Sequence, residues 1–404
     1  MIFIPFWLYK EFKNDKIEQK FVEIKGDNMR KVRILQTGDL HFDTPFKDLN
    51  KKISIISKEE LLEVFSKIID ISIENSVDIL LLTGDIFDNL TVNKKTLIFI
   101  KNQIERISNI RVFISPGNHD PYNEKSFYKM IDWPNNVYIF KGSMESVTIE
   151  SLNTVVWGAA FNEHHIRKSI LKDVKIKENY INIMTIHGDI SNTDEGNEYN
   201  PITLMDIAKS KLDYIAIGHR HNFSEILREE NTYYAYAGCP QGRGFDELGD
   251  KGIILGEVTK GAVDLKFLKT SKRNYYVEEI DISNSVSYDE VRMKILAAIK
   301  EEDRKNNLYK IILKGEIESY INLREEVILE KIKGDFYFVK VIDKTEVKLD
   351  FDKISKDYSI KGVYARKLLE KINEEDSDKE ILQMALKLGI QSLSHEEVNL
   401  NDYR

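Results

Sequence analysis

Five short motifs rich in metal-binding side chains lie within the first 221 residues, each after an apolar, β-rich run. They supply carboxylates, imidazoles and an amide, the nitrogen and oxygen ligands that suit Mn²⁺, Fe²⁺, Zn²⁺ or, less well, Mg²⁺. Two such metals ~3.5–4 Å apart can activate a water as hydroxide and hold phosphate oxygens during in-line attack. The motifs therefore predict phosphate-ester hydrolysis. They are Asp39-Leu40-His41, Gly84-Asp85, Gly117-Asn118-His119-Asp120, His187-Gly188-Asp189 and Gly218-His219-Arg220-His221.

The runs before these motifs have the length of strands and are continuously apolar, as in strands buried on both faces. Ligands in open α/β sheets collect outside the carboxyl ends of the strands, so we expect the motifs to meet at one edge. Asp85 closes the most apolar run and is the candidate to bridge both metals. The runs are Val32–Gln36, Val77–Thr83, Ile110–Ile114, Ile181–Ile186 and Leu212–Ile217.

Helical patterns separate several of the strands. Ser57-Lys58-Glu59-Glu60 resembles a capping box that opens a helix to about Glu74, and a second helix fits Lys94–Ile107. Shorter strands follow, and the whole predicts an α/β sandwich of two sheets with helices outside. These strands are Val137–Phe140, Val147–Ile149, Val155–Trp157, Tyr233–Ala237, Ile253–Val258 and Val263–Phe267.

The pattern changes after the basic stretch Lys269–Arg273. A strand-helix-strand-helix-strand order then predicts a small α+β domain, and two amphipathic helices are expected at Val363–Ile372 and Lys379–Leu388. We therefore expect an N-terminal extension (1–29), a hydrolase domain (30–270), a small domain (271–345) and a C-terminal helical segment (346–404). The elements of the small domain are Tyr275–Ile282, Tyr288–Ile299, Leu308–Leu313, Leu323–Ile332 and Phe336–Ile342.

Composition sets broad limits. The chain has 404 residues, enough for two or three domains, and its single cysteine, Cys239, excludes an internal disulfide and fits a reducing cytoplasm. A net charge of −8 argues weakly against a nucleic-acid partner, although two bound divalent metals would offset part of it locally. No stretch approaches the ~20 apolar residues of a membrane span. Residues 1–28 make a poor signal peptide and are expected to be an upstream extension.

The motif set resembles the calcineurin-like metallophosphoesterases. More narrowly, two segments resemble the SbcD/YhaO-type DNA repair exonucleases: Gly38–Phe46 and Gly238–Glu247. The resemblance is carried by residues 30–270, and it continues beyond them only in the order of the domains.

This resemblance implies a role for each motif residue. Asp39, His41 and His221 would hold one metal, Asn118, His187 and His219 the other, and both would share Asp85. Manganese is the implied metal. His119 would be the catalytic histidine that protonates the leaving oxygen, and Asp120 would orient it. Asp88 stands where some eukaryotic and archaeal relatives carry a histidine, which leaves a second proton donor open.

Each candidate also has a plainer interpretation. Asp43 and Asp189 could accept hydrogen bonds beside the metals or merely form turns, and Gly84, Gly117, Gly188 and Gly218 would permit tight turns. Arg220 and Arg243 could contact phosphate or be ordinary surface charge. Three other residues are expected to have no role in the chemistry: His164 and His165 on a solvated face, and Cys239 as a small strand-end residue. His395 lies in a polar tail and is given no role.

The resemblance implies several binding partners, and one possible contact with nucleic acid is left open by the sequence. The Lys269–Arg273 stretch with Tyr275 and Tyr276 could contact nucleic acid, and an ordinary interdomain linker is the alternative. The resemblance implies that the small domain caps the site and holds DNA. It also implies that the C-terminal helices dock on the coiled-coil base of an SbcC-like, chromosome-maintenance-type ATPase, and that two copies associate.

The leading functional prediction is a DNA exonuclease in DNA repair. A phosphodiesterase for cyclic nucleotides or other small esters is the alternative, and the roughly 130 residues after Lys269 count against it because a small substrate needs no cap. A scaffold that has lost catalysis is the third possibility, and the complete ligand set counts against it.

Overall fold

The computed structural model describes residues 30–88, 92–191, 197–318, 323–374 and 378–393. The predicted extension 1–29 and His395 lie outside these residues. Within them, no helix is long and apolar enough to cross a membrane.

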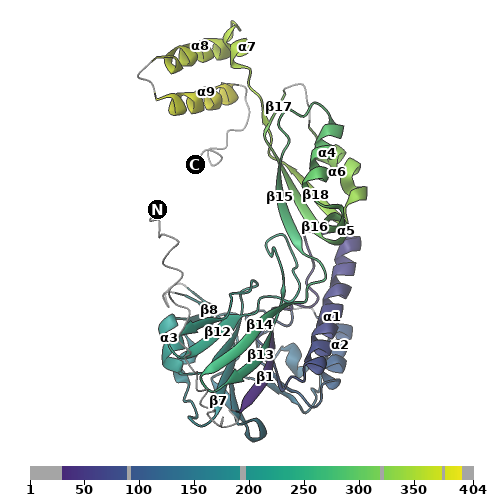
Figure 1. The fold of residues 1–404 in the computed structure, drawn as a ribbon, viewed down its shortest axis with the longest axis vertical. Coiled ribbons are helices and arrows are strands. Elements are labelled where there is room, and N and C mark those ends of the chain that lie inside the picture. Colours follow the sequence, from purple (N-terminus) through teal and green to yellow (C-terminus); the bar gives the residue numbers. More distant parts are fainter. Residues whose placement is uncertain (1–29, 89–91, 192–196, 319–322, 375–377, 394–404) are drawn as a thin grey trace, which may run out of the picture.

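Two mixed six-stranded sheets form the larger part of the molecule (Figure 1). In each sheet four neighbouring strands run parallel. In the first sheet the second strand of the order is antiparallel to both of its neighbours, and in the second sheet the two edge strands are antiparallel to theirs. The first sheet has the order β14 (Ala262–Lys269), β13 (Gly252–Thr259), β1 (Lys31–Thr37), β2 (Ile79–Leu82), β3 (Arg111–Ile114), β4 (Val137–Ile139). The second has the order β11 (Leu227–Glu229), β12 (Thr232–Tyr236), β10 (Tyr214–Gly218), β7 (Ile181–His187), β6 (Thr154–Gly158), β5 (Glu145–Ile149).

The two sheets pack face to face. Ile34 and Leu81 of the first sheet share a buried core with Ile183 and Ala216 of the second, all four fully buried. Burying both faces of the central strands explains why their sequences are continuously apolar rather than alternating. The predicted two-sheet α/β sandwich is confirmed.

Helices cover the outer faces of the sheets. α1 (Lys51–Glu74) and α2 (Lys94–Glu105) pack on the first sheet, and α3 (Leu204–Ser210) packs on the second. The predicted start of the first helix is wrong. Asn50 accepts a hydrogen bond from the N–H of Ile53 and caps the helix one residue before Lys51, while Ser57 is buried on the inner face of the helix. Asparagine is as good a cap as serine, and nothing between the two positions stops a helix.

A third sheet is parallel and has its own core (Figure 1). It has the order β15 (Tyr275–Asp281), β16 (Leu308–Lys314), β18 (Phe338–Asp343), and α4 (Tyr288–Ala298) and α6 (Glu325–Ile332) pack against it. Because this core is separate, we propose the domain division expected from the sequence. The remaining elements are β8 (Asp189–Ile190), β9 (Pro201–Ile202), α5 (Glu301–Asn306), β17 (Glu316–Ile317), β19 (Glu346–Val347), α7 (Phe351–Ser355), α8 (Ile360–Ile372) and α9 (Lys379–Leu393).

The basic stretch before the third sheet is tied to α1. Arg273 pairs with the buried carboxylate of Glu60 at 2.8 Å and stacks 3.6 Å from the Tyr337 ring centroid. Lys272 forms an ion pair with Glu63. These two cations are therefore engaged within the protein, which favours the linker interpretation over a nucleic-acid contact.

Candidate metal centre

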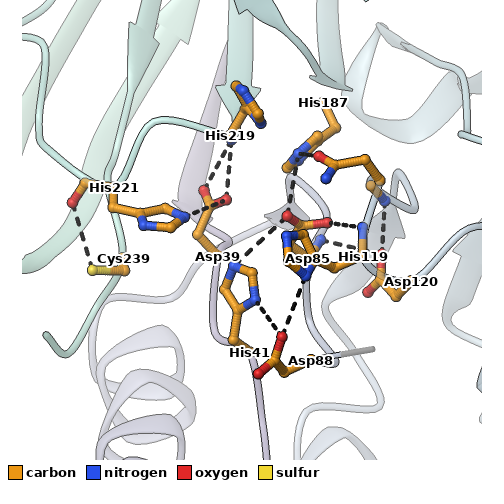
Figure 2. Close-up of polar contacts among 12 residues, drawn as sticks. Asp39, His41, Asp85, Asp88, His119, Asp120, His187, His219, His221 and Cys239 are labelled. Atoms are coloured by element: carbon orange, nitrogen blue, oxygen red, sulfur yellow. Dashed lines mark hydrogen bonds and ion pairs between the residues drawn. The ribbon is translucent and has the colours of Figure 1, made fainter. Parts of the chain in front are cut away.

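The five motifs meet between the carboxyl ends of the two sheets (Figure 2). Asp39, Asp85 and His119 follow β1, β2 and β3 of the first sheet, while His187 ends β7 and His219 follows β10 of the second. Parallel strands place their carboxyl ends on the same edge, which is why motifs nearly 200 residues apart converge here.

Among the described residues three overlapping groups of ligand atoms could each hold a metal. Within each group the ligand atoms lie within 4.8 Å of one another, and Asp39 belongs to two of the groups. The Asp85 Oδ2 atom lies 3.6 Å from Nε2 of His41 and 3.4 Å from Nε2 of His187. Asp85 thus stands between the two predicted ligand sets, where a bridging carboxylate would have to be. The groups that contain Asp39 are Asp39, His41, His221 and Asp39, Asp85, His187, and the third is formed by His41, Asp88 and His119.

His41 shows that these side chains suit a cation. Both of its ring nitrogens are buried without a hydrogen bond, and each faces a carboxylate at a longer distance, Asp85 at 3.6 Å and Asp88 at 3.5 Å. A buried polar group without a partner is costly in free energy. Burial lowers the pKa of His41 to about 4, so the ring is neutral at physiological pH, the form that binds metals. A divalent cation would satisfy the orphaned ring.

His187 is aimed in the same way. Its Nδ1–H donates to the carbonyl oxygen of Thr83 at 2.9 Å, which leaves the lone pair on Nε2. That nitrogen lies 2.9 Å from Oδ1 of Asn118 and faces Asp85. The lone pairs of these three side chains therefore face one another in a buried pocket, which is the arrangement that binds a cation.

The two remaining predicted ligands lie at the side of this group. His221 places Nε2 3.8 Å from Oδ1 of Asp39. The backbone N–H of His219 donates to both oxygens of Asp39 at 3.1 Å, and its ring lies 5.3 Å from the His187 ring and 5.0 Å from the Tyr199 ring. The His219 ring is not part of the groups above, so its role as a ligand stays a prediction.

His119 lies beside Asp88. The Asp88 Oδ1 atom is 3.3 Å from Nδ1 of His119 and 3.5 Å from Nδ1 of His41. The hydrogen bond to Asp88 raises the pKa of His119, which favours the protonated ring. Asp88 thus links the predicted acid to a predicted metal ligand.

Asp120, expected to orient His119, makes different contacts. Its carboxylate accepts hydrogen bonds from the backbone N–H groups of Ile86 (2.7 Å) and Gly117 (2.7 Å) and from the Tyr128 hydroxyl (2.6 Å). These bonds tie the loops after β2 and β3 together. Asp88, and not Asp120, therefore faces the His119 ring, while the carboxylate of Asp120 braces the backbone.

The remaining residues predicted near the chemistry lie around the centre, each with contacts of its own. The Arg220 guanidinium pairs with Asp189 at 2.8 Å and donates to the carbonyl oxygen of Ile190, while Asp43 accepts from the N–H of Asn93. The Arg243 side chain is 13% exposed and lies beside His221, so it is not an ordinary surface charge. Whether either arginine contacts substrate stays a prediction. Cys239 is buried, which raises the pKa of its thiol.

Sequence reasoning missed two neighbours of the centre. His164 is exposed, as expected, but its Nδ1 lies 2.7 Å from the carbonyl oxygen of Asn118. Glu247, which closes one of the two diagnostic segments, lies 2.8 Å from Nδ1 of His221. Its position in that segment was the available signal. Nothing in the local sequence distinguishes His164 from its neighbour His165, which is also exposed.

Comparison with known proteins agrees with this geometry. Residues 32–223 match the calcineurin-like phosphoesterase family. The chain is 29% identical over 264 residues to the uncharacterized metallophosphoesterase YhaO of Bacillus subtilis, covering 63% of this chain and 64% of YhaO, just under two thirds of that relative. It is 26% identical to the DNA double-strand break repair protein Mre11 of Thermoplasma acidophilum, and the match covers 64% of this chain and 72% of that protein. It is 25% identical to Mre11 of Saccharolobus solfataricus, and that match covers 70% of this chain and 76% of that protein.

Proposed function

On the premise that residues 32–223 belong to the calcineurin-like phosphoesterases, we propose that this protein is a metal-dependent DNA exonuclease. The observation that carries the hydrolase part is His41, whose two buried ring nitrogens make no hydrogen bond and lie among Asp39, Asp85 and Asp88. The DNA part is supported by similarity to relatives named for double-strand break repair.

In this proposal Asp39, His41 and His221 hold one divalent metal, and Asn118, His187 and His219 hold the other, with Asp85 shared. When bound, the metals, of which manganese is the proposed one, would polarise the phosphate and activate the attacking water. His119 donates a proton to the departing sugar oxygen. Asp88 holds the His119 ring through Nδ1 and favours its protonated form.

The test is digestion of end-labelled linear and closed circular DNA of the same sequence, with Mn²⁺ or Mg²⁺. Loss of the linear form alone supports an exonuclease, because a circle offers no end. A second arm measures turnover of a small aryl phosphodiester. Turnover of that ester without digestion of DNA would instead support a small-molecule phosphodiesterase. No turnover of either substrate by metal-loaded protein would support the scaffold.

We also propose that the C-terminal helices bind a chromosome-maintenance-type ATPase. α8 and α9 pack on each other around Ala365 and Ile390, yet they leave Ile360 77% exposed and Ile381 64% exposed. Exposed apolar side chains on two paired helices fit a coiled-coil partner. Ile381→Asp should abolish co-purification with such an ATPase, whereas a charge change at the neighbouring exposed Glu380 should not. Light scattering of the purified chain tests the association of two copies that the family resemblance implies.

A further inference from the structure

The loop between β12 and β13 contacts both the metal centre and the third sheet. We call residues Arg243-Gly244-Phe245-Asp246-Glu247 the 243–247 loop. Its first and last residues contact the ring of His221, and its middle residue points into the packing between α1 and the third sheet. One five-residue segment therefore touches two parts of the molecule with different cores.

Glu247 holds the His221 ring in one orientation. Its Oε1 atom lies 2.8 Å from Nδ1 of His221, while Nε2 on the other side of the ring points toward Asp39. A carboxylate is only an acceptor, so Nδ1 carries a proton, and in the neutral ring Nε2 then keeps its lone pair. That is the tautomer needed to bind a metal beside Asp39.

Arg243 holds Glu247 in place and is also a potential competitor. Its backbone N–H donates to Oε2 of Glu247 at 2.8 Å, and its Nη2 lies 2.5 Å from Oε1. The same Nη2 lies 3.1 Å from Nδ1 of His221. If Glu247 were absent, Arg243 could donate to Nδ1. The proton would then move to Nε2, where it would block the metal.

Phe245 anchors the loop from the other side. Its side chain is 6% exposed and packs with Ile53 of α1 and with Tyr275 and Leu308 of the third sheet. The rings of Phe245 and Tyr275 meet edge to face with centroids 5.1 Å apart. Phe245 lies two residues from both Arg243 and Glu247. The packing of Phe245 against the third sheet therefore constrains the positions of these two side chains.

We propose that Glu247 is the positioning residue of His221, and that Phe245 makes this positioning depend on how the third sheet packs against the hydrolase domain. The proposal rests on the metal site proposed above. It predicts that a partner or substrate that shifts the third sheet also changes metal affinity at His221, because the loop is common to both.

Isothermal titration of the metal-free protein with Mn²⁺ tests the first half. Glu247→Ala should weaken one of the two binding events by about 10- to 100-fold, the range found when groups behind a histidine ligand are removed. Glu247→Gln keeps an acceptor oxygen but loses the charge, so it should lie between wild type and alanine. Asp246→Asn is the matched control, since Asp246 is exposed on the same loop, and should bind as wild type.

Phe245→Ala and Phe245→Leu test the second half. Alanine should weaken the same binding event by a smaller factor than Glu247→Ala does, whereas leucine fills most of the space and should weaken it less than alanine. Circular dichroism of each metal-free variant shows that it is folded. Leucine also keeps the test informative if the alanine variant does not fold, because a leucine variant that packs less tightly should show a smaller loss.

The outcomes separate the two proposals. If folded Glu247→Ala binds Mn²⁺ as wild type does, the positioning role is wrong. If Glu247→Ala is weakened but folded Phe245→Ala is not, the coupling is wrong. If wild type binds two metals but cleaves no DNA, only the proposed function fails. Wild type that binds no Mn²⁺ overturns both.

Discussion

Replacing His119 by alanine is the sharpest test of the proposed chemistry. The side chain is 35% exposed, so its loss leaves little cavity. The hydrogen bond from His119 to Oδ1 of Asp85 comes from the backbone N–H (2.9 Å) and survives the substitution. The variant should therefore fold and bind metal as wild type does, while it lacks the proton donor.

The expected loss depends on the leaving group. Proton transfer by a positioned side chain contributes about 10²- to 10⁴-fold to rate, which corresponds to about 3–5 kcal/mol of transition-state stabilisation. A sugar alkoxide is a poor leaving group and needs the full contribution, so cleavage of DNA should fall by that factor. A p-nitrophenolate ion is stable without a proton, so hydrolysis of bis(p-nitrophenyl) phosphate should fall far less.

The assay compares kcat for both substrates at saturating Mn²⁺, with His165→Ala as the matched control. His165 is 48% exposed and pairs with Glu198 rather than with the metal centre. Two results would refute the reasoning. Wild-type cleavage of DNA by the variant would remove His119 from the mechanism. An equal loss on both substrates would show that His119 positions metal or phosphate rather than donating a proton.

Three further changes separate the neighbouring roles. Asp88→Asn should slow cleavage of DNA and move the alkaline limb of the pH–rate profile to lower pH. The reason is that the substitution weakens the hydrogen bond that raises the pKa of His119. An unchanged alkaline limb would exclude this role of Asp88. Asp120→Ala should leave several buried backbone N–H groups without acceptors, at about 1–3 kcal/mol each, and should lower both the melting temperature and metal stoichiometry, unlike His119→Ala. Arg273→Met should leave the buried Glu60 with only its longer ion pair to Lys272 (3.9 Å) and cost up to about 3 kcal/mol in urea unfolding. Lys269→Met at an exposed ion pair should cost little.

The strand-end motifs could be predicted because β-strands in a parallel sheet must place their carboxyl ends together. Asp39, Asp85 and His187 needed only that rule and a continuous apolar run before each of them. The start of α1 could not be predicted in the same way. Asn50 and Ser57 are equally plausible caps in sequence, and the choice between them depends on which turn is buried against the first sheet.

Partners behind the ligands depend on geometry that sequence does not contain. Asp88 and Asp120 both follow predicted strands and both carry carboxylates, yet only Asp88 points at the imidazole of His119. Glu247 reaches His221 across 26 positions of sequence because Arg243 and the backbone of its own loop turn it inward. Such contacts are set by side-chain direction, so a motif can locate the ligands without showing which residues orient them.

The backbone at the centre shows a further difference from the sequence interpretation. Glycines were expected to permit tight turns, but Gly84 alone among the four motif glycines has a positive φ. At Gly218 the reason is space, since a Cβ atom there would lie 2.2 Å from the carbonyl oxygen of Thr83. The positive φ values instead occur at proposed ligands, including Asp39 (50°) and His41 (46°).

Such conformations cost of order 1–3 kcal/mol for a residue other than glycine and persist only where the surroundings impose them. Here the surroundings are hydrogen bonds between the two loops. The N–H of Asp39 donates to the carbonyl oxygen of Gly84, and the N–H of His41 donates to that of Asp85, both at 2.9 Å. The loops after β1 and β2 therefore hold each other in the strained form. Because this pairing needs no metal, the fold itself directs the side chains of Asp39 and His41 into the centre. Metal binding therefore does not have to supply the free energy of ordering them.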